Sequence, residues 1–168
     1  MAKSFRRESG QRLHQSPLRA TYTFSAGVII SLLLLGVKTT KADEDPKEEI
    51  IRITKEMLHA IDHRDFNTYR NMTVNYLSCF EPQTKGQLVE GLDFHKYFFD
   101  RFPISDGPTT IVNPRVHLFG TDVACIGYVR LRQRMVGSTA EVLQTQETRV
   151  WQKINGQWKL IHFHRSDS

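Results

Sequence analysis

The stretch from residue 141 to residue 165 constrains the fold of this chain more than any other part. Two runs with alternating side-chain character, 141–154 and 157–165, flank the dipeptide Asn155-Gly156. Both residues of such a pair tolerate the positive φ angles of a type I′ turn, the tight turn that joins antiparallel strands. The pattern therefore predicts a long β-hairpin.

Each strand of the predicted hairpin carries an arginine among apolar side chains. Because successive side chains of a strand point to opposite faces, Arg149 shares its face with Glu147 and Trp151. On the second strand, the alternation predicts two opposite sets: Ile161, Phe163 and Arg165, and Leu160, His162 and His164. A guanidinium on a buried face is unfavourable unless polar or anionic groups meet it. The hairpin therefore indicates a polar cavity beneath the sheet.

The positive charge of the sequence is concentrated at its N-terminus. The 168 residues have a formal net charge of +5, but residues 1–41 hold seven Lys and Arg against one Glu. Residues 42–168 hold the remaining 16 Lys and Arg against 17 Asp and Glu, so this part is nearly neutral. Because nucleic-acid-binding domains concentrate positive charge on their folded surface, we expect no nucleic-acid partner.

Residues 1–42 are predicted to be a basic, apolar leader, separate from a folded domain at 43–168. An uncharged apolar run at 24–37 follows the basic segment. It is short for a bilayer span of about 20 residues, so a cleaved signal, an untargeted leader and a marginal anchor, with membrane contact through 22–37, remain alternatives. Localisation stays open, and a glycan at the Asn71 sequon would indicate lumenal exposure.

Helical patterns open the folded part. Asp45 is suited to cap a helix over 46–62, whose apolar residues follow helical spacing. A shorter helix follows a cap at Asp65, and a third follows Gly91 and is ended by Pro103. Strands are predicted over 77–80, 109–112, 114–119, 123–135, 141–154 and 157–165. Helices followed by a meander of antiparallel strands indicate an α+β fold.

A third arginine is also predicted to share a strand face with apolar side chains. On the strand over 123–135, alternation places Arg130 on one face with Ile126 and Tyr128. Three arginines on three strands of one sheet, with His95 on a nearby helix, predict a polar pocket. Two readings of that pocket remain open. Either a small anion bridges the arginines, or internal acids such as Glu147 and Glu81 neutralise them as a structural network.

Several motifs carry a specific resemblance. They occur in one order from about residue 44 to 167, at 80–82, 88–95, 113–118, 124–126, 146–151 and 162–166. Together they resemble the association (hub) domain of calcium/calmodulin-dependent protein kinase II. The resemblance implies a cone-shaped, NTF2-like α+β roll whose subunits assemble into stacked rings, usually dodecamers or tetradecamers, that hold kinase domains together and favour a cytoplasmic location.

The resemblance also implies a pocket for small carboxylates. The matching positions are Arg130, Arg149 and Arg165 with His95 beside them, and we place Tyr128 in the same pocket. No kinase domain or calmodulin-binding helix precedes residue 44 in this sequence, so we expect a stand-alone, non-catalytic hub that needs no cofactor. Its expected partners are copies of itself and kinase II subunits.

An NTF2-like enzyme, such as an isomerase, dehydratase or hydrolase, is the alternative to a hub. Its acid and base groups would come from Asp93, His95, Tyr128, Glu147 and His162. However, guanidiniums dominate the pocket, and they do not exchange protons near neutral pH.

Other chemistry-bearing residues have simpler interpretations. The pattern His162-x-His164 lacks a third metal ligand, so no metal site is predicted. Cys79 and Cys125 are interpreted as buried free thiols, and Trp151, Trp158 and the aromatic residues over 92–102 as packing residues.

Overall fold

The computed structural model describes residues 44–104 and 107–167, so the leader predicted for 1–42 lies outside the described residues. Among the described residues, no helix combines the length and apolar character needed to cross a bilayer. The elements in chain order are α1 (Pro46–Asp62), α2 (Phe66–Asn71), β1 (Thr73–Phe80), the 3-10 turn η1 (Pro82–Thr84), β2 (Val89–Glu90), α3 (Asp93–Arg101), β3 (Thr109–Phe119), β4 (Val123–Val136), β5 (Thr139–Ile154) and β6 (Gln157–Asp167).

The helix starts follow from local capping chemistry. The Asp45 carboxylate accepts a hydrogen bond from the backbone N–H of Lys47 at 2.9 Å, and Pro46 occupies the first helical position. Asp65 caps α2 in the same way, through the N–H of Thr68 at 3.0 Å. Both helix starts, and the end of α1 at Asp62, are confirmed.

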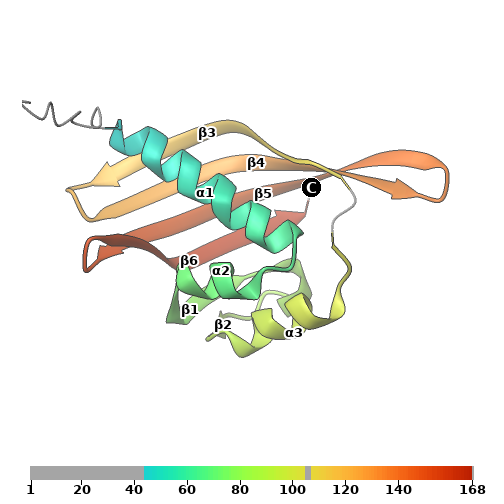
Figure 1. Cartoon of the computed structure of the whole chain (residues 1–168), viewed down its shortest axis with the longest axis horizontal. Helices are drawn as coiled ribbons and strands as arrows, with labels where there is room; N and C mark the ends of the chain where they lie inside the picture. The colour runs from blue at the N-terminus through green and yellow to red at the C-terminus, as the bar shows by residue number, and fades with distance from the viewer. Residues whose placement is uncertain (1–43, 105–106, 168) are drawn as a thin grey trace, which may run out of the picture. The chain divides into compact units, whose positions relative to one another are not determined.

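Six strands form one sheet in the order β2-β1-β6-β5-β4-β3, as Figure 1 shows. All neighbouring strands are antiparallel except β1 and β6, which run parallel. The strand nearest the end of the sequence, β6, therefore lies inside the sheet between β1 and β5. The α+β class with a mostly antiparallel sheet is confirmed.

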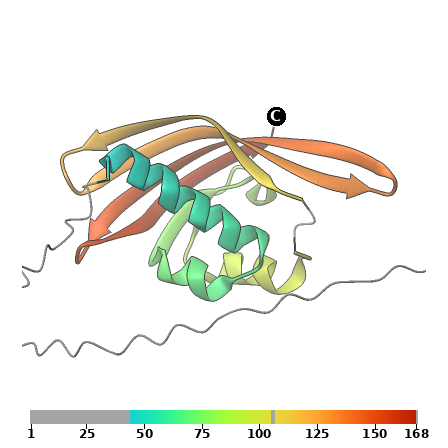
Figure 2. The ribbon, with the colours of Figure 1, turned by 45° about the horizontal axis from the view of Figure 1, so that its top comes forward.

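The helices cover one face of the curved sheet, and α1 crosses β3 and β4 (Figures 1 and 2). Met57 and Leu58 of α1 are buried against the sheet residues Ile126, Trp151 and Leu160. Burying each of these side chains contributes about 1.5–3 kcal/mol. This packing therefore holds the helices over the concave face of the sheet. The arginines lie on that face, between the sheet and the helices.

Two strand predictions were wrong in extent. Strand β1 begins at Thr73 rather than at residue 77, and it pairs with both β2 and β6. The two strands predicted over 109–112 and 114–119 form one strand, β3, with a register shift around Asn113, whose φ is 50°. Asparagine tolerates this left-handed conformation, so an irregularity bends the strand without ending it.

One face assignment on β6 was also wrong. Val150 pairs with His162 but Trp151 pairs with Leu160, so Ile161 is an extra residue in the ladder. This β-bulge turns Leu160 inward, where it is fully buried, and leaves Ile161 half-buried. Beyond the bulge the predicted alternation is confirmed, with Phe163 buried and His164 exposed.

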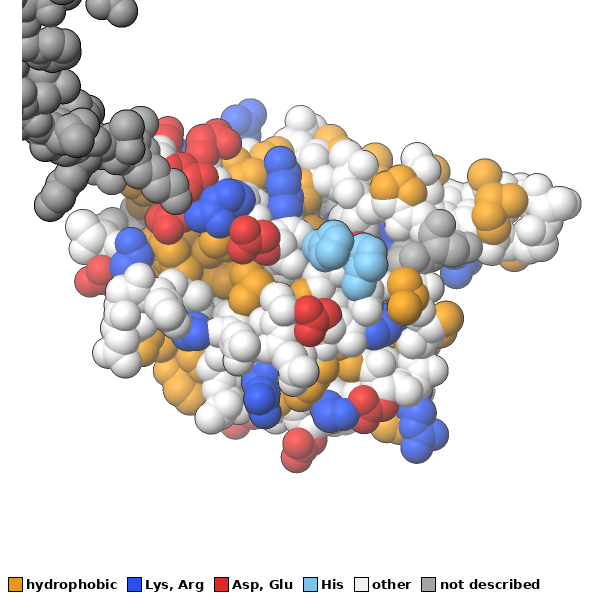
Figure 3. All heavy atoms as spheres, viewed as in Figure 1, with side chains coloured by type: hydrophobic (Ala, Val, Ile, Leu, Met, Phe, Trp, Pro, Cys, Tyr) orange, Lys and Arg blue, Asp and Glu red, His pale blue; other side chains and the backbone are white. Residues whose placement is uncertain are grey.

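The described surface has mixed charge. Figure 3 shows acidic and basic side chains interspersed over the helix-covered face, which agrees with the near-neutral charge of residues 42–168.

Cys79 is buried as predicted, whereas Cys125 is only half-buried because it lies on the face of β4 opposite the helices. The prediction of a buried thiol was therefore wrong for Cys125.

Candidate functional site: an arginine-lined cavity

A cavity of about 160 Å³ lies between the concave face of the sheet and the helices. Four of the five predicted pocket residues line it, namely His95 from α3, Arg130 from β4, Arg149 from β5 and Arg165 from β6. The fold therefore brings together side chains that are up to 70 residues apart in the sequence. Tyr128, the fifth, does not line the cavity but lies behind it, where it contacts Arg149.

The innermost contacts join Tyr128, Glu147 and Arg149. The Tyr128 hydroxyl donates to the Glu147 carboxylate at 2.6 Å and accepts from Arg149 Nε at 2.7 Å. Arg149 Nη2 donates to the same carboxylate at 2.8 Å. Burial acts to raise the pKa of Glu147, but the Arg149 and Arg130 guanidiniums and the Tyr128 hydroxyl lower it to about 2. Glu147 is therefore a permanent anion here and has no capacity as a general base near neutral pH.

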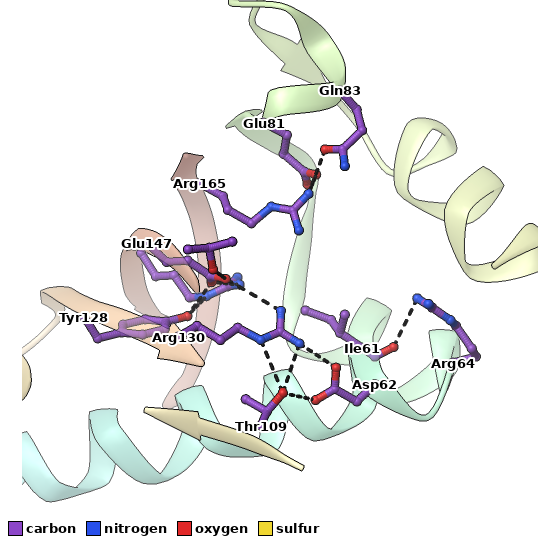
Figure 4. Close-up of polar contacts among 12 residues, drawn as sticks. Ile61, Asp62, Arg64, Glu81, Gln83, Thr109, Tyr128, Arg130, Glu147 and Arg165 are labelled. Atoms are coloured by element: carbon purple, nitrogen blue, oxygen red, sulfur yellow. Dashed lines mark hydrogen bonds and ion pairs between the residues drawn. The ribbon is translucent and has the colours of Figure 1, made fainter. Parts of the chain in front are cut away.

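Arg130 connects the end of α1 to the sheet. Its guanidinium forms an ion pair with Asp62, hydrogen-bonds Thr109 and lies 3.6 Å from Glu147 (Figure 4). The Thr109 hydroxyl in turn donates to Asp62. All four polar groups are thus satisfied by one another, so this corner of the site is structural. Asp62 was not predicted as a member, because the helical pattern alone does not show which end residue turns inward.

Arg165 has a separate acidic partner. Its Nη2 donates to Glu81 at 2.9 Å and to the Gln83 side chain at 2.7 Å (Figure 4). Burial raises the pKa of Glu81 against the opposing effect of Arg165 and Arg149. Each of the three predicted arginines therefore contacts an internal carboxylate, as expected from the hypothesis that internal acids neutralise them.

The cavity nevertheless retains free donors and uncancelled charge. Arg149 Nη1 and Arg165 Nε are buried nitrogens without a hydrogen-bond partner among the described residues. Two further arginines, Arg64 and Arg132, also line the cavity and make no ion pair within the described part of the chain. Sequence reasoning missed both. Arg132 shares the inward face of β4 with Arg130 and was findable by alternation, whereas Arg64 follows the end of α1 and carries no such signal.

His95 is a neutral side chain in this setting. It is 5 % exposed, and burial together with the nearby Arg149 charge lowers its pKa to about 4. Its Nδ1 lies 3.9 Å from Glu81 and its Nε2 lies 3.8 Å from Cys79 Sγ. Burial raises the pKa of the Cys79 thiol to about 12.

The described residues include a group whose side chains could hold a metal ion, namely Cys79, Glu81 and His95. Their ligand atoms lie within 4.8 Å of one another. Two observations oppose a cation there. First, the positively charged Arg149 and Arg165 guanidiniums line the same cavity. Second, Glu81 lies near Nδ1 of the His95 ring and Cys79 lies near Nε2, and only one of these two nitrogens can bind a given ion. The donor set thus fits a structural contact better than a metal.

The remaining candidate acid and base groups do not converge on the cavity. His162 lies on the opposite face of β6, where its Nδ1 is 2.8 Å from the Ser78 hydroxyl, and Asp93 is exposed at the start of α3. Three aromatic residues interpreted as packing residues, Phe98, Phe99 and Phe102, also form part of the cavity wall, and Phe99 belongs to the buried core as predicted. The arrangement is suited to holding an anion against an aromatic wall, because guanidiniums bind anions without exchanging protons.

Comparison with known proteins places this geometry in a family. The family model for the calcium/calmodulin dependent protein kinase II association domain matches residues 46–168. The chain belongs to this association-domain family. It is 46% identical over 137 residues to the calcium/calmodulin-dependent protein kinase type II subunit delta of Oryctolagus cuniculus, a match that covers 77% of this chain and 26% of the relative. The chain thus spans about a quarter of the length of the curated relatives it matches.

Comparison with solved structures supports the same family and shows the fold. The association domain of C. elegans CaMKII superposes with a TM-score of 0.69 at 42% identity, covering 71% of this chain and 94% of that one. An NTF2-like protein from Cytophaga hutchinsonii superposes with a TM-score of 0.64 at 15% identity, covering 74% of this chain and all of that one, which shows the shared fold. The predicted NTF2-like α+β fold and the kinase II association-domain resemblance are confirmed, and family membership supports a role in oligomerisation.

Proposed function

We propose that this chain is a non-catalytic oligomerisation hub that assembles into a ring, scaffolds kinase II subunits, and binds a small carboxylate in its arginine-lined cavity. The observation that carries the proposal is the family match over residues 46–168, nearly the whole described domain. The ring would be a dodecamer or tetradecamer built from repeated contacts between identical subunits.

The described surface offers material for such contacts. Large apolar side chains are exposed on several elements, including Tyr76 on β1, Phe119 at the end of β3 and Val142 on β5, each more than half exposed. Contact with another subunit would remove this apolar surface from water, which is favourable. Strand β3 also forms an open edge of the sheet, with backbone groups available for pairing.

Molar mass in solution tests the assembly. Because the chain has a mass of 19.5 kDa, a dodecamer would have about 230 kDa and light scattering distinguishes it from a monomer or dimer at once. A mass near 20 or 40 kDa at all accessible concentrations would reject the ring. Co-expression with the kinase type II delta subunit should give mixed particles; complete sorting into separate assemblies would reject the scaffolding role.

Calorimetry tests the carboxylate. Arg149→Ala should abolish butyrate binding while the ring persists, because it removes the free Nη1 donor from the inner cavity wall. Arg165→Gln is the second variant, since Arg165 is partly exposed and its loss leaves the Glu147 network intact. Arg134→Ala is the control, because Arg134 is exposed and pairs with Glu141 outside the cavity. Unchanged affinity in both pocket variants would reject the ligand site.

A further inference from the structure

The cavity has an outer pair of arginines that the internal acids do not neutralise. Arg132 is half-buried on β4, two residues beyond Arg130, and lines both the cavity and an adjoining hollow formed with Gln83 and Thr145. It makes no ion pair or hydrogen bond through its side chain within the described part of the chain. Burial and the neighbouring Arg130 charge lower the pKa of Arg132, against the opposing effect of Asp62.

Arg64 is held in place by neutral groups. It has a φ of 58° directly after the end of α1, and its Nε donates to the Pro103 carbonyl at 2.8 Å. Its Nη1 donates to the Ile61 carbonyl at 3.3 Å (Figure 4). These bonds orient the guanidinium beside the cavity but leave its charge uncancelled, since carbonyl oxygens carry no net charge.

A charge count around the cavity shows the excess. Five arginines line it, and the carboxylates paired with them are three, namely Asp62, Glu81 and Glu147. His95 adds no charge near neutral pH because its pKa is lowered to about 4. The remaining nearby acid, Asp167, is exposed in the outer hollow and makes no ion pair with the described residues. The arginines that line the cavity and the carboxylates paired with them therefore carry an excess of two positive charges.

We propose that the ligand of this cavity is a small dicarboxylate of four or five carbons. This inference rests on the proposed carboxylate site and adds that one carboxylate meets Arg149 Nη1 and Arg165 Nε, while the second meets Arg132 and Arg64 at the outer end. A ligand with two charges cancels the excess that a monocarboxylate would leave half uncancelled.

The space and the placement of the donors agree with this class. An apolar cavity of about 150 Å³ holds a six-carbon ring, so the cavity of about 160 Å³ admits a ligand of roughly that size. The hollow that adjoins it at Arg132 adds space for a second carboxylate. The unpartnered inner nitrogens lie on β5 and β6, whereas the outer arginines come from β4 and the segment after α1. The two carboxylates of the proposed ligand would match these two groups of donors, whereas a phosphate has a single anionic centre.

Calorimetric titration of the full chain with succinate and butyrate separates the possibilities, because the two acids share a four-carbon skeleton and differ in one carboxylate. A charge-assisted contact is worth enough to change affinity about tenfold or more, so succinate should bind at least that much more tightly. Arg132→Gln should remove most of this preference and change butyrate affinity by no more than about threefold. Arg134→Gln, which removes the same charge two residues further along β4, should keep the preference.

The possible outcomes are distinct. Equal affinity for succinate and butyrate in the unaltered chain overturns the dicarboxylate inference and leaves the carboxylate site standing. Failure of both acids to bind overturns the site itself. Inorganic phosphate that binds as tightly as succinate overturns the two-centre arrangement. Arg132→Gln is verified by circular dichroism and by an unchanged mass in light scattering; if it then keeps the full succinate preference, the assigned role of Arg132 is wrong.

Discussion

Replacing Glu147 by Gln probes the claim that internal carboxylates hold the inner arginines in place. The Glu147 side chain is fully buried, pairs with Arg149 at 2.8 Å and lies 3.6 Å from Arg130. Glutamine keeps the shape but removes the charge, so two buried guanidiniums lose their shared counterion. Removing one partner of a buried ion pair typically costs about 3–5 kcal/mol, and we expect a loss of that size for E147Q.

The free energy of unfolding is obtained from urea titrations at pH 7, at one protein concentration so that assembly contributes equally. Glu141→Gln is the matched control, because Glu141 forms an exposed pair with Arg134 on the same hairpin. Its loss should cost no more than about 1 kcal/mol. Added succinate should restore part of the stability of E147Q, since a bound dianion supplies the missing charge.

The effect of pH gives an independent test. The pKa of Glu147 is lowered to about 2 in the fold, so its contribution is complete above the ordinary value of 4.5 and is lost as the pH falls toward 2. The stability difference between the unaltered chain and E147Q should therefore shrink across that window. If E147Q costs no more than E141Q at pH 7, the carboxylate does not hold the arginines and the reasoning is refuted.

Two further predictions concern His95 and the hairpin turn. The pKa of His95 is lowered to about 4, so its stabilising effect is complete above pH 6.5 and falls as the pH drops; this accounts for about 2 kcal/mol of stability lost between pH 7 and pH 5. His95→Gln should flatten the urea-derived stability profile in that range, and an equally steep profile would contradict the assignment. Gly156 has a φ of 77°, so Gly156→Ala should cost about 1 kcal/mol in thermal unfolding, whereas an increase in stability would show that the turn does not need this conformation.

The arginine faces were predictable because strand alternation is a strict geometric rule. Arg130, Arg149 and Arg165 occupy the inward faces that the alternation assigns to them, and the turn at Asn155-Gly156 sets the register of β5 and β6. The rule does not anticipate a bulge, since an extra residue such as Ile161 leaves no local mark in composition.

The acidic partners were harder to predict than the arginines. Asp62 ends a helix, and its reach to Arg130 depends on how α1 lies on the sheet, which is a tertiary feature. Arg64 lines the cavity only because the chain reverses after α1 and its guanidinium meets the Pro103 carbonyl, 39 residues away. Hydrophobic periodicity and secondary-structure propensity describe single helices and strands, so they do not predict contacts between elements.

The position of β6 inside the sheet has a consequence for synthesis. Strand β1 is complete by residue 80, yet its parallel partner begins only at residue 157. At about 5–20 residues per second, the nascent chain waits roughly 4–15 s between the two, with one side of β1 unpaired and the cavity still lacking Arg165. A growing polypeptide of this kind exposes an open strand edge until β6 has left the ribosome, so removing β6 would leave β2-β1 and β5-β4-β3 as two half-sheets with nothing to join them.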